Sequence, residues 1–256
     1  MTDLHSHILY GIDDGARSLE ESRRMLLQAR EVGYRRIVST RHYPNNQFKG
    51  DGEDFSISQR LEIVKSEAET LGMEVLRGAE VMISPETLRE IEDGQADTLG
   101  ESRTVLIEFQ VGSIERGGLE SVRRIVEAGY IPLIAHVERY RWKTEILGEL
   151  KKLGGILQMN MRAAALGKDQ WREWLTSGLI DVLATDAHRA EGRSYELTEE
   201  IAALKSLLGE ERFKILTEIN PERLLAGEEL IQWEEKPEEK ISSLGKLLRL
   251  VRRKKK

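Results

Sequence analysis

Seven short apolar segments alternate with helical segments between residues 2 and 184 of this chain. The predicted strands lie within residues 2–15 and at 36–40, 73–81, 104–109, 131–136, 156–160 and 181–184. Strands that alternate with helices form parallel sheets, and short right-handed crossovers close such a sheet into a barrel. The sequence therefore predicts an α/β fold, a seven-stranded (β/α)7 TIM-like barrel. An open doubly wound sheet is the alternative topology.

Histidines and acids collect at the carboxyl ends of these predicted strands. All five histidines lie there, together with three acids, and an aspartate follows the first strand in a glycine-containing loop. Strand alternation also places two side chains of each His-x-His or Asp-x-His pair on one face. Because carboxyl ends of parallel strands share one rim, nine candidate metal ligands are expected together: His5, His7, Asp14, His42, Glu80, Glu108, His136, Asp186 and His188.

Nine donors exceed the four to six or so that one ion usually takes, so two or three cations are implied. Imidazole and carboxylate donors without thiolate suit manganese, iron or zinc. Clustered cations are suited to phosphate ester hydrolysis, because they neutralise phosphoryl oxygens and activate water. The chain contains no cysteine, which excludes disulfides and a cysteine nucleophile.

Each candidate also has a purely structural interpretation. His42 alone could be a hydrogen-bonded structural residue, and Glu108 could pair with an arginine. Asp14 lies between Asp13 and Gly15, which could form only a turn. Nine such coincidences on one rim are improbable.

Two arginines follow strand ends closely enough to lean over the rim. Arg139 lies three residues after His136, and Arg193 lies seven after Asp186. Each could bind a phosphate through its forked guanidinium, although a solvated surface position is the alternative. Arg41 precedes His42, and strand alternation points it away from the rim.

The carboxyl-terminal part differs in composition from the rest. Residues 1–227 are expected to form the barrel domain and residues 228–256 an appendage. The appendage ends in a basic amphipathic pattern with seven basic and no acidic residues from Lys246 onward. This end could touch an anionic membrane or an acidic partner, or be solvated.

The acidic remainder, within a net charge of −6, argues against nucleic acid as a partner. Without a secretory signal or an apolar run of about 18 residues, a cytoplasmic location is expected.

Five sequence stretches together resemble the PHP (polymerase and histidinol phosphatase) superfamily. They are DLHSHILYGIDDG at 3–15, GAE at 78–80, LIEF at 106–109, IAHVERY at 134–140, and ATDAH at 184–188 with Gly192 and Arg193. Within the superfamily they are most similar to the bacterial manganese-dependent protein-tyrosine phosphatases of the CpsB and YwqE group. The resemblance extends to about Pro221. Arg41 departs from the pattern, because this group tends to have proline or a small residue there.

The resemblance implies a distorted seven-stranded barrel with a trinuclear centre, for which Mn²⁺ is the expected metal. It assigns His5, His7, Glu80 and Asp186 to the first metal, Glu80, Glu108 and His136 to the second, and Asp14, His42 and His188 to the third. Acids at positions 14 and 108, where other branches often have histidine, favour the tyrosine phosphatase group. Arg139 and Arg193 match arginines near the substrate phosphate.

The expected function is therefore hydrolysis of phosphotyrosine by a metal-dependent phosphatase. The expected substrate is the tail of a bacterial tyrosine kinase that controls capsule or exopolysaccharide synthesis. Two alternatives stay open at this point. One is a PHP-type phosphatase or phosphodiesterase for a small metabolite such as histidinol phosphate. The other is a non-enzymatic, metal-stabilised protein held in a membrane complex by its basic tail.

Overall fold

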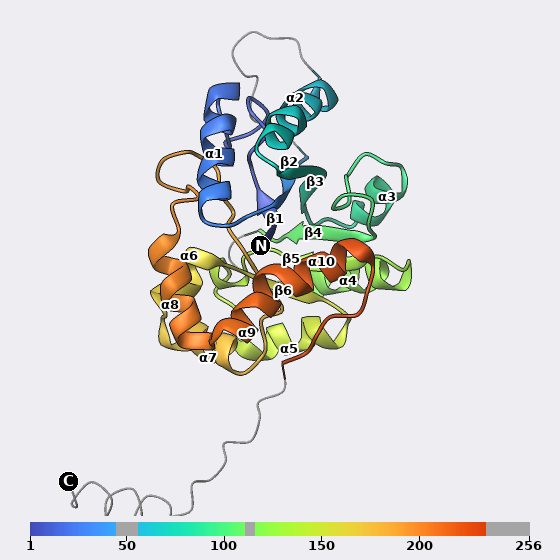
Figure 1. Ribbon diagram of the computed structural model, residues 1–256. Helices are drawn as coiled ribbons and strands as arrows, with labels where there is room; N and C mark the ends of the chain where they lie inside the picture. The colour runs from blue at the N-terminus through green and yellow to red at the C-terminus, as the bar shows by residue number, and fades with distance from the viewer. Residues whose placement is uncertain (45–55, 111–115, 234–256) are drawn as a thin grey trace, which may run out of the picture.

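The computed structural model describes residues 1–44, 56–110 and 116–233 of the chain. Seven parallel strands follow one another around a barrel in the order of the sequence (Figure 1). They are β1 (Thr2–Ser6), β2 (Arg36–Tyr43), β3 (Glu74–Met82), β4 (Thr104–Glu108), β5 (Ile131–Ile134), β6 (Ile156–Asn160) and β7 (Val182–Ala184). The predicted seven-stranded α/β barrel is therefore confirmed, and the open doubly wound sheet is not found.

Helices follow the strands and cover the outside of the barrel (Figure 1). They are α1 (Leu19–Glu31), α2 (Ile57–Thr70), α3 (Thr87–Glu92), α4 (Arg116–Glu127), α5 (Thr144–Lys152), α6 (Met161–Leu166), α7 (Asp169–Thr176), α8 (Thr198–Leu208), α9 (Glu210–Lys214) and α10 (Asn220–Ala226). Two short segments add a 3₁₀ turn at Val137–Arg139 and a π-helical turn at Ile215–Ile219. In the described part of the chain, no helix is both long and apolar enough to cross a bilayer.

Two apolar clusters fill the fold. The larger one lies between the strands and the surrounding helices. The smaller one fills the barrel interior, where Leu4, Val38, Leu106 and Leu133 meet Leu224 of α10. Helix α10 also accepts a hydrogen bond from Thr104 at the start of β4, so it covers the amino ends of the strands. The interior is thus apolar at the amino end, which leaves the carboxyl end for polar side chains.

The barrel closes between β7 and β1 without a regular ladder. A single bridge joins Ser6 to Ala187, and the amide N–H of Asp186 donates to the carbonyl of His5 at 2.8 Å. Behind this seam lies Asp3, a fully buried carboxylate. It accepts hydrogen bonds from the hydroxyl of Thr185 at 2.5 Å and the hydroxyl of Tyr195 at 2.7 Å. Side-chain hydrogen bonds therefore replace the missing ladder, which is how this barrel is distorted.

Several local boundaries differ from the prediction. Strand β5 ends at Ile134 rather than at residue 136, and α6 was not predicted. Helix α3 begins at Thr87, after a turn in which Ser84 Oγ accepts from the N–H of Glu86. Strand β5 ends early because His136 adopts left-handed backbone, which the apolar pattern does not reveal.

The segment after α10 lies against the barrel domain. The side chain of Asn220 exchanges two hydrogen bonds with the backbone of Ile231, and the guanidinium of Arg212 stacks on Trp233. The division into residues 1–227 and 228–256 stays a prediction. The expected amphipathic stripe of the appendage lies outside the described residues.

We expect Asp3→Ala to lower the free energy of unfolding by about 3 kcal/mol, because it leaves buried donors of Thr185 and Tyr195 unpaired. Tyr195→Phe removes one of these hydrogen bonds and should cost about 1 kcal/mol. Urea denaturation followed by circular dichroism would measure both. An Asp3→Ala protein as stable as the wild type would show that the seam does not depend on this carboxylate.

Candidate metal centre

Strand alternation carries three of the candidate ligands into the barrel interior. Along β2, β3 and β4 every second side chain faces inward, and the parallel register sets His42 opposite Glu80 and Met82 opposite Glu108. Nδ1 of His42 consequently lies 3.1 Å from Oε2 of Glu80 and 3.7 Å from Oε2 of Glu108. Period-two geometry alone accounts for this part of the site.

The first strand reaches the same place through an irregularity. The register of β1 against β2 shifts between Asp3 and Ser6, as at a β-bulge. Leu4 can therefore join the interior cluster while its neighbour His5 also faces the site, which a regular strand does not allow. Nε2 of His5 lies 3.3 Å from Nε2 of His7. Oε2 of Glu80 lies 3.3 Å from the first of these nitrogens and 3.2 Å from the second.

Two more candidates lie just beyond strand ends in left-handed backbone. His136 has φ of 30° and Asp186 has φ of 54°, values that are uncommon outside glycine. The turn brings Nε2 of His136 to 2.7 Å from Oε1 of Glu80. Oδ1 of Asp186 lies 3.3 Å from Nε2 of His5. This left-handed conformation thus directs one ligand that follows β5 and one that follows β7 over the mouth of the barrel.

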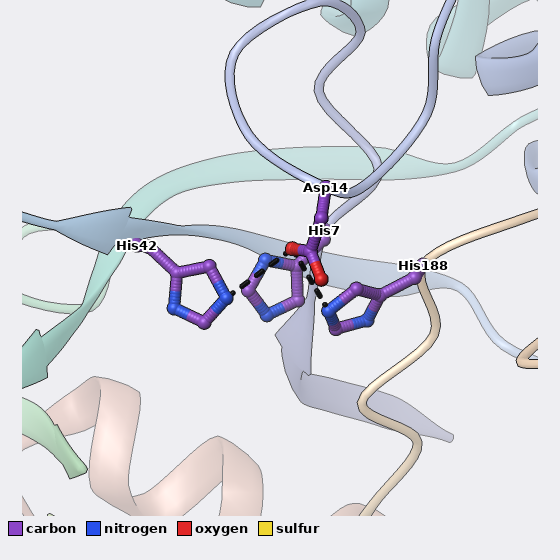
Figure 2. A group of neighbouring side chains, drawn as sticks. All are labelled: His7, Asp14, His42 and His188. Atoms are coloured by element: carbon purple, nitrogen blue, oxygen red, sulfur yellow. Dashed lines mark ion pairs between the residues drawn. The ribbon is translucent and has the colours of Figure 1, made fainter. Parts of the chain in front are cut away.

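Asp14 joins two histidines at the solvent side of the site (Figure 2). Its Oδ1 lies 3.3 Å from Nε2 of His42 and 3.3 Å from Nε2 of His188, with the His7 ring between them. The side chain of Asp14 is 60% exposed, whereas His188 is buried. Asp14 is therefore not merely a turn residue, because its carboxylate reaches over the rim.

The structure brings all nine predicted residues together. In the described part of the chain, their donor atoms form four overlapping groups, each within 4.8 Å. The groups are His7, Asp14, His42 and His188; His5, His136 and Asp186; His5, His7 and Glu80; and His42, Glu80 and Glu108. The ion pairs described for Glu108 are with His42 and His136, so the alternative of an arginine partner is not found.

The donor set fits divalent cations. Oδ1 of Asp186 and Nδ1 of His136 are buried without a hydrogen-bond partner, although such atoms are normally satisfied. The ring nitrogens of His5 and His7 face each other at 3.3 Å, where two lone pairs would repel unless a cation or proton lay between them. Nitrogen and oxygen donors without sulfur suit Mn²⁺, Fe²⁺ or Zn²⁺.

Burial and neighbouring charges shift the pKa values of these histidines in opposite directions. Burial disfavours the charged form of His7, but Asp13 and Glu80 outweigh burial and raise its pKa well above the usual value. For His42, burial is likewise outweighed by Asp14 and Glu80, and the pKa is raised to about 10. Burial and the charge of His7 lower the pKa of His188 to about 4. His7 and His42 therefore carry protons at neutral pH that a metal must displace.

Residues that sequence analysis missed support the ligands. Asp13 is buried and accepts hydrogen bonds from Nδ1 of His7 at 2.8 Å and from the amide N–H of His42 at 3.1 Å. Gln158 and Asn160 of β6 make similar contacts to other ligands. Their inward position on a predicted strand was a usable signal, but an amide carries no metal-ligand signature. Asp13 differs from Asp14 only in the direction of its side chain, which sequence does not reveal.

The two predicted arginines lie at the rim. Nη1 of Arg139 is 3.6 Å from Oδ2 of Asp186, and Nη2 of Arg193 is 2.5 Å from the same oxygen. Their side chains are 43% and 44% exposed, so a ligand entering from solvent can reach them. Arg41 instead points away from the site and pairs with Asp97 at 3.1 Å, as strand alternation predicted.

We expect Zn²⁺ binding to the metal-free protein at pH 7 to release protons, because the pKa values of His5, His7 and His42 are all raised. Metal affinity should therefore rise as the pH is increased from 6 to 8. Titration calorimetry in buffers of different ionisation enthalpy would count the protons. Binding without proton release would contradict the proposed exchange of protons for metal.

Comparison with known proteins places this site in a family. Residues 1–226 match the family described as capsular polysaccharide synthesis, CpsB/CapC. Tyrosine-protein phosphatase CpsB of Streptococcus pneumoniae is 30% identical over 240 residues, which cover 88% of this chain and 98% of that protein.

Solved structures agree with this assignment. A structure from a study of YwqE from Bacillus subtilis and CpsB from Streptococcus pneumoniae, described as unique metal-dependent tyrosine phosphatases, matches with a TM-score of 0.81 and 28% identity. The match covers 91% of this chain and 97% of that one. A histidinol phosphate phosphatase from Lactococcus lactis shares the fold, with a TM-score of 0.50 and 16% identity over 80% of this chain and 93% of that one. The resemblance to the CpsB and YwqE group is thereby confirmed, and the chain belongs to the CpsB/CapC family.

Proposed function

We propose that this protein is a metal-dependent phosphatase that hydrolyses phosphotyrosine in proteins. The observation that carries the proposal is the convergence of nine imidazole and carboxylate donors beneath two rim arginines. Two relatives that match this chain over almost their whole length are named tyrosine-protein phosphatases, which supports the proposal. A purely structural cluster would be expected to satisfy Oδ1 of Asp186, which is buried here without a hydrogen-bond partner.

The proposed cofactor is a set of three divalent ions, most suitably Mn²⁺, with Fe²⁺ or Zn²⁺ as alternatives. His5, His7, Glu80 and Asp186 would hold the first, Glu80, Glu108 and His136 the second, and Asp14, His42 and His188 the third. When bound, such ions would supply charge stabilisation at phosphoryl oxygens and a nucleophile at neutral pH.

The arginines are proposed to bind and orient the substrate phosphate. Arg193 and Arg139 both contact Oδ2 of Asp186, and their forked guanidinium groups can turn to a phosphate while keeping their half-exposed position. Three divalent ions would exceed the charge of the four carboxylates in the set by about two, which matches a phosphate monoester dianion. The chain would thus orient the phosphate with its arginines, while its four carboxylates would leave the bound ions with the excess positive charge that the phosphate balances.

Access to the site favours a phosphate presented on a protein. Asp14 and both arginines are the most exposed side chains of the set, so the centre opens to solvent at the rim rather than at the bottom of a closed cavity. We propose a phosphorylated tyrosine kinase of capsule or exopolysaccharide synthesis as the substrate, in keeping with the family description. A small phosphorylated metabolite such as histidinol phosphate is the second candidate, since the same centre would serve it.

We expect His136→Ala and Asp186→Ala to reduce hydrolysis of an aryl phosphate by at least about 10³-fold, because each removes a ligand from the centre. A chelator should abolish the wild-type activity and Mn²⁺ should restore it. Asp97→Ala, which removes an acid outside the site, is the matched control and should retain the activity. Full activity in either site variant would exclude the proposed centre. Higher kcat/KM for histidinol phosphate than for a phosphotyrosine peptide would favour the metabolite.

We also propose a cytoplasmic location and a peripheral contact between the basic end of the chain and an anionic membrane or an acidic partner. The proposal rests on the seven basic residues from Lys246 onward. Removal of residues 239–256 should abolish co-sedimentation with phosphatidylserine vesicles at low salt. Equal binding by the full and shortened proteins would refute the membrane contact.

A further inference from the structure

One strand of the barrel contributes no candidate ligand, yet its side chains touch ligands from three other strands. The inward residues at the carboxyl end of β6 are Gln158, which is fully buried, and Asn160. Gln158 contacts His5 from β1 and His136 after β5, and Asn160 contacts Asp186 after β7. Among the described residues, β6 therefore links ligands that come from widely separated parts of the sequence.

The direction of each hydrogen bond between these side chains follows from one fixed donor. The backbone N–H of His136 can only donate, and the Gln158 atom 2.8 Å away must be the amide oxygen, Oε1. The amide nitrogen of Gln158 then donates to Oδ1 of Asn160 at 2.8 Å. The amide nitrogen of Asn160 in turn donates to Oδ2 of Asp186 at 2.8 Å. No amide in this sequence of contacts can be reversed without placing like atoms together.

The same oxygen determines the tautomer of His5. Oε1 of Gln158 lies 3.2 Å from Nδ1 of His5, and an oxygen can only accept there. Nδ1 must therefore carry the hydrogen, which leaves the lone pair of a neutral His5 on Nε2. This nitrogen faces Oδ1 of Asp186 and Oε2 of Glu80, at 3.3 Å from each. The lone pair thus points into the donor cluster.

At the other end of this series of hydrogen bonds, Asn160 contacts one particular oxygen of Asp186. Asn160 donates to Oδ2, the oxygen that Arg139 and Arg193 also contact. Oδ1 is left buried and without a hydrogen-bond partner on the side of His5. A carboxylate held through one oxygen presents the other to a cation.

We infer that Gln158 and Asn160 form an amide relay that fixes His5 as an Nε2 ligand and Asp186 as an Oδ1 ligand of one divalent ion. The inference rests on the proposed metal centre but names residues outside its ligand set. Both amides are positioning residues, because they contact ligands and not substrate. Such supporting contacts typically change metal affinity about 10- to 100-fold when removed.

Metal affinity of the full chain, rather than activity, tests the relay. We expect Gln158→Leu to weaken Zn²⁺ binding by about 10- to 100-fold in competition with a chromophoric chelator, and to change the absorption spectrum of the Co²⁺-loaded protein. Asn160→Ala should cause a smaller loss. The loss in the double variant should be smaller than the sum of the two single losses, because the two amides are hydrogen-bonded to each other. Fully additive losses, or wild-type affinity in Gln158→Leu, would overturn the relay.

Two controls separate the relay from general stability and from the centre itself. Asn220 is an equally buried amide outside the site, and its side chain forms hydrogen bonds with the backbone of Asp181 and Ile231. Asn220→Leu should lower the Tm without changing metal affinity, and a comparable loss of affinity in it would assign the Gln158 effect to stability alone. His136→Ala should weaken Zn²⁺ binding whether or not the relay exists. Normal Zn²⁺ binding by His136→Ala would refute the proposed metal centre. Weak binding by His136→Ala together with normal binding by Gln158→Leu would refute only the relay.

The wild-type protein provides a test that does not depend on any variant folding. Long-range ¹H–¹⁵N correlation spectra of the Zn²⁺-loaded protein report which ring nitrogen carries hydrogen. We expect His5 with hydrogen on Nδ1 and metal on Nε2. Metal on Nδ1 of His5 would overturn the relay, because Gln158 would then face a nitrogen without hydrogen.

Discussion

Closure of the barrel between β7 and β1 brings the two ends of the metal site together. Asp186 and His188 come from the end of the barrel sequence, and His5 and His7 come from its beginning, so the site exists only if the barrel closes. Closure uses one bridge, backbone hydrogen bonds from Asp186 and His7, and the buried carboxylate of Asp3. A continuous ladder would hold the last strand regular. Its absence allows Asp186 to take the left-handed backbone that aims its carboxylate inward.

Charge explains why this arrangement requires cations. Four carboxylates and five imidazoles are packed at distances near 3 Å, and most are shielded from water. In the metal-free protein the histidine pKa values separate: those of His5, His7 and His42 are raised, whereas those of His136 and His188 are lowered. A divalent ion can take the place of these protons and satisfy the same acids. Metal binding is therefore coupled to the release of protons.

Much of this site could be predicted from the sequence, because strand periodicity carries the information. His42, Glu80 and Glu108 lie at alternating positions on strands with simple register, and sequence spacing alone places them inward. The relation of His5 to Leu4 could not be predicted, because it depends on a bulge. The left-handed backbone of His136 was also missed, and its strand was predicted two residues too long. Asp13, Gln158 and Asn160 act through hydrogen bonds whose partners are distant in sequence, so no local pattern reveals them.

We propose that nine side chains of one barrel rim hold three divalent ions. Anomalous diffraction from crystals of the Mn²⁺-loaded protein, recorded on both sides of the manganese absorption edge, would locate these ions. We expect three anomalous peaks at the carboxyl rim: one among His5, His7, Glu80 and Asp186, one among Glu80, Glu108 and His136, and one among Asp14, His42 and His188. Fully loaded crystals with no peak at this rim, or with a single peak, would contradict the claim.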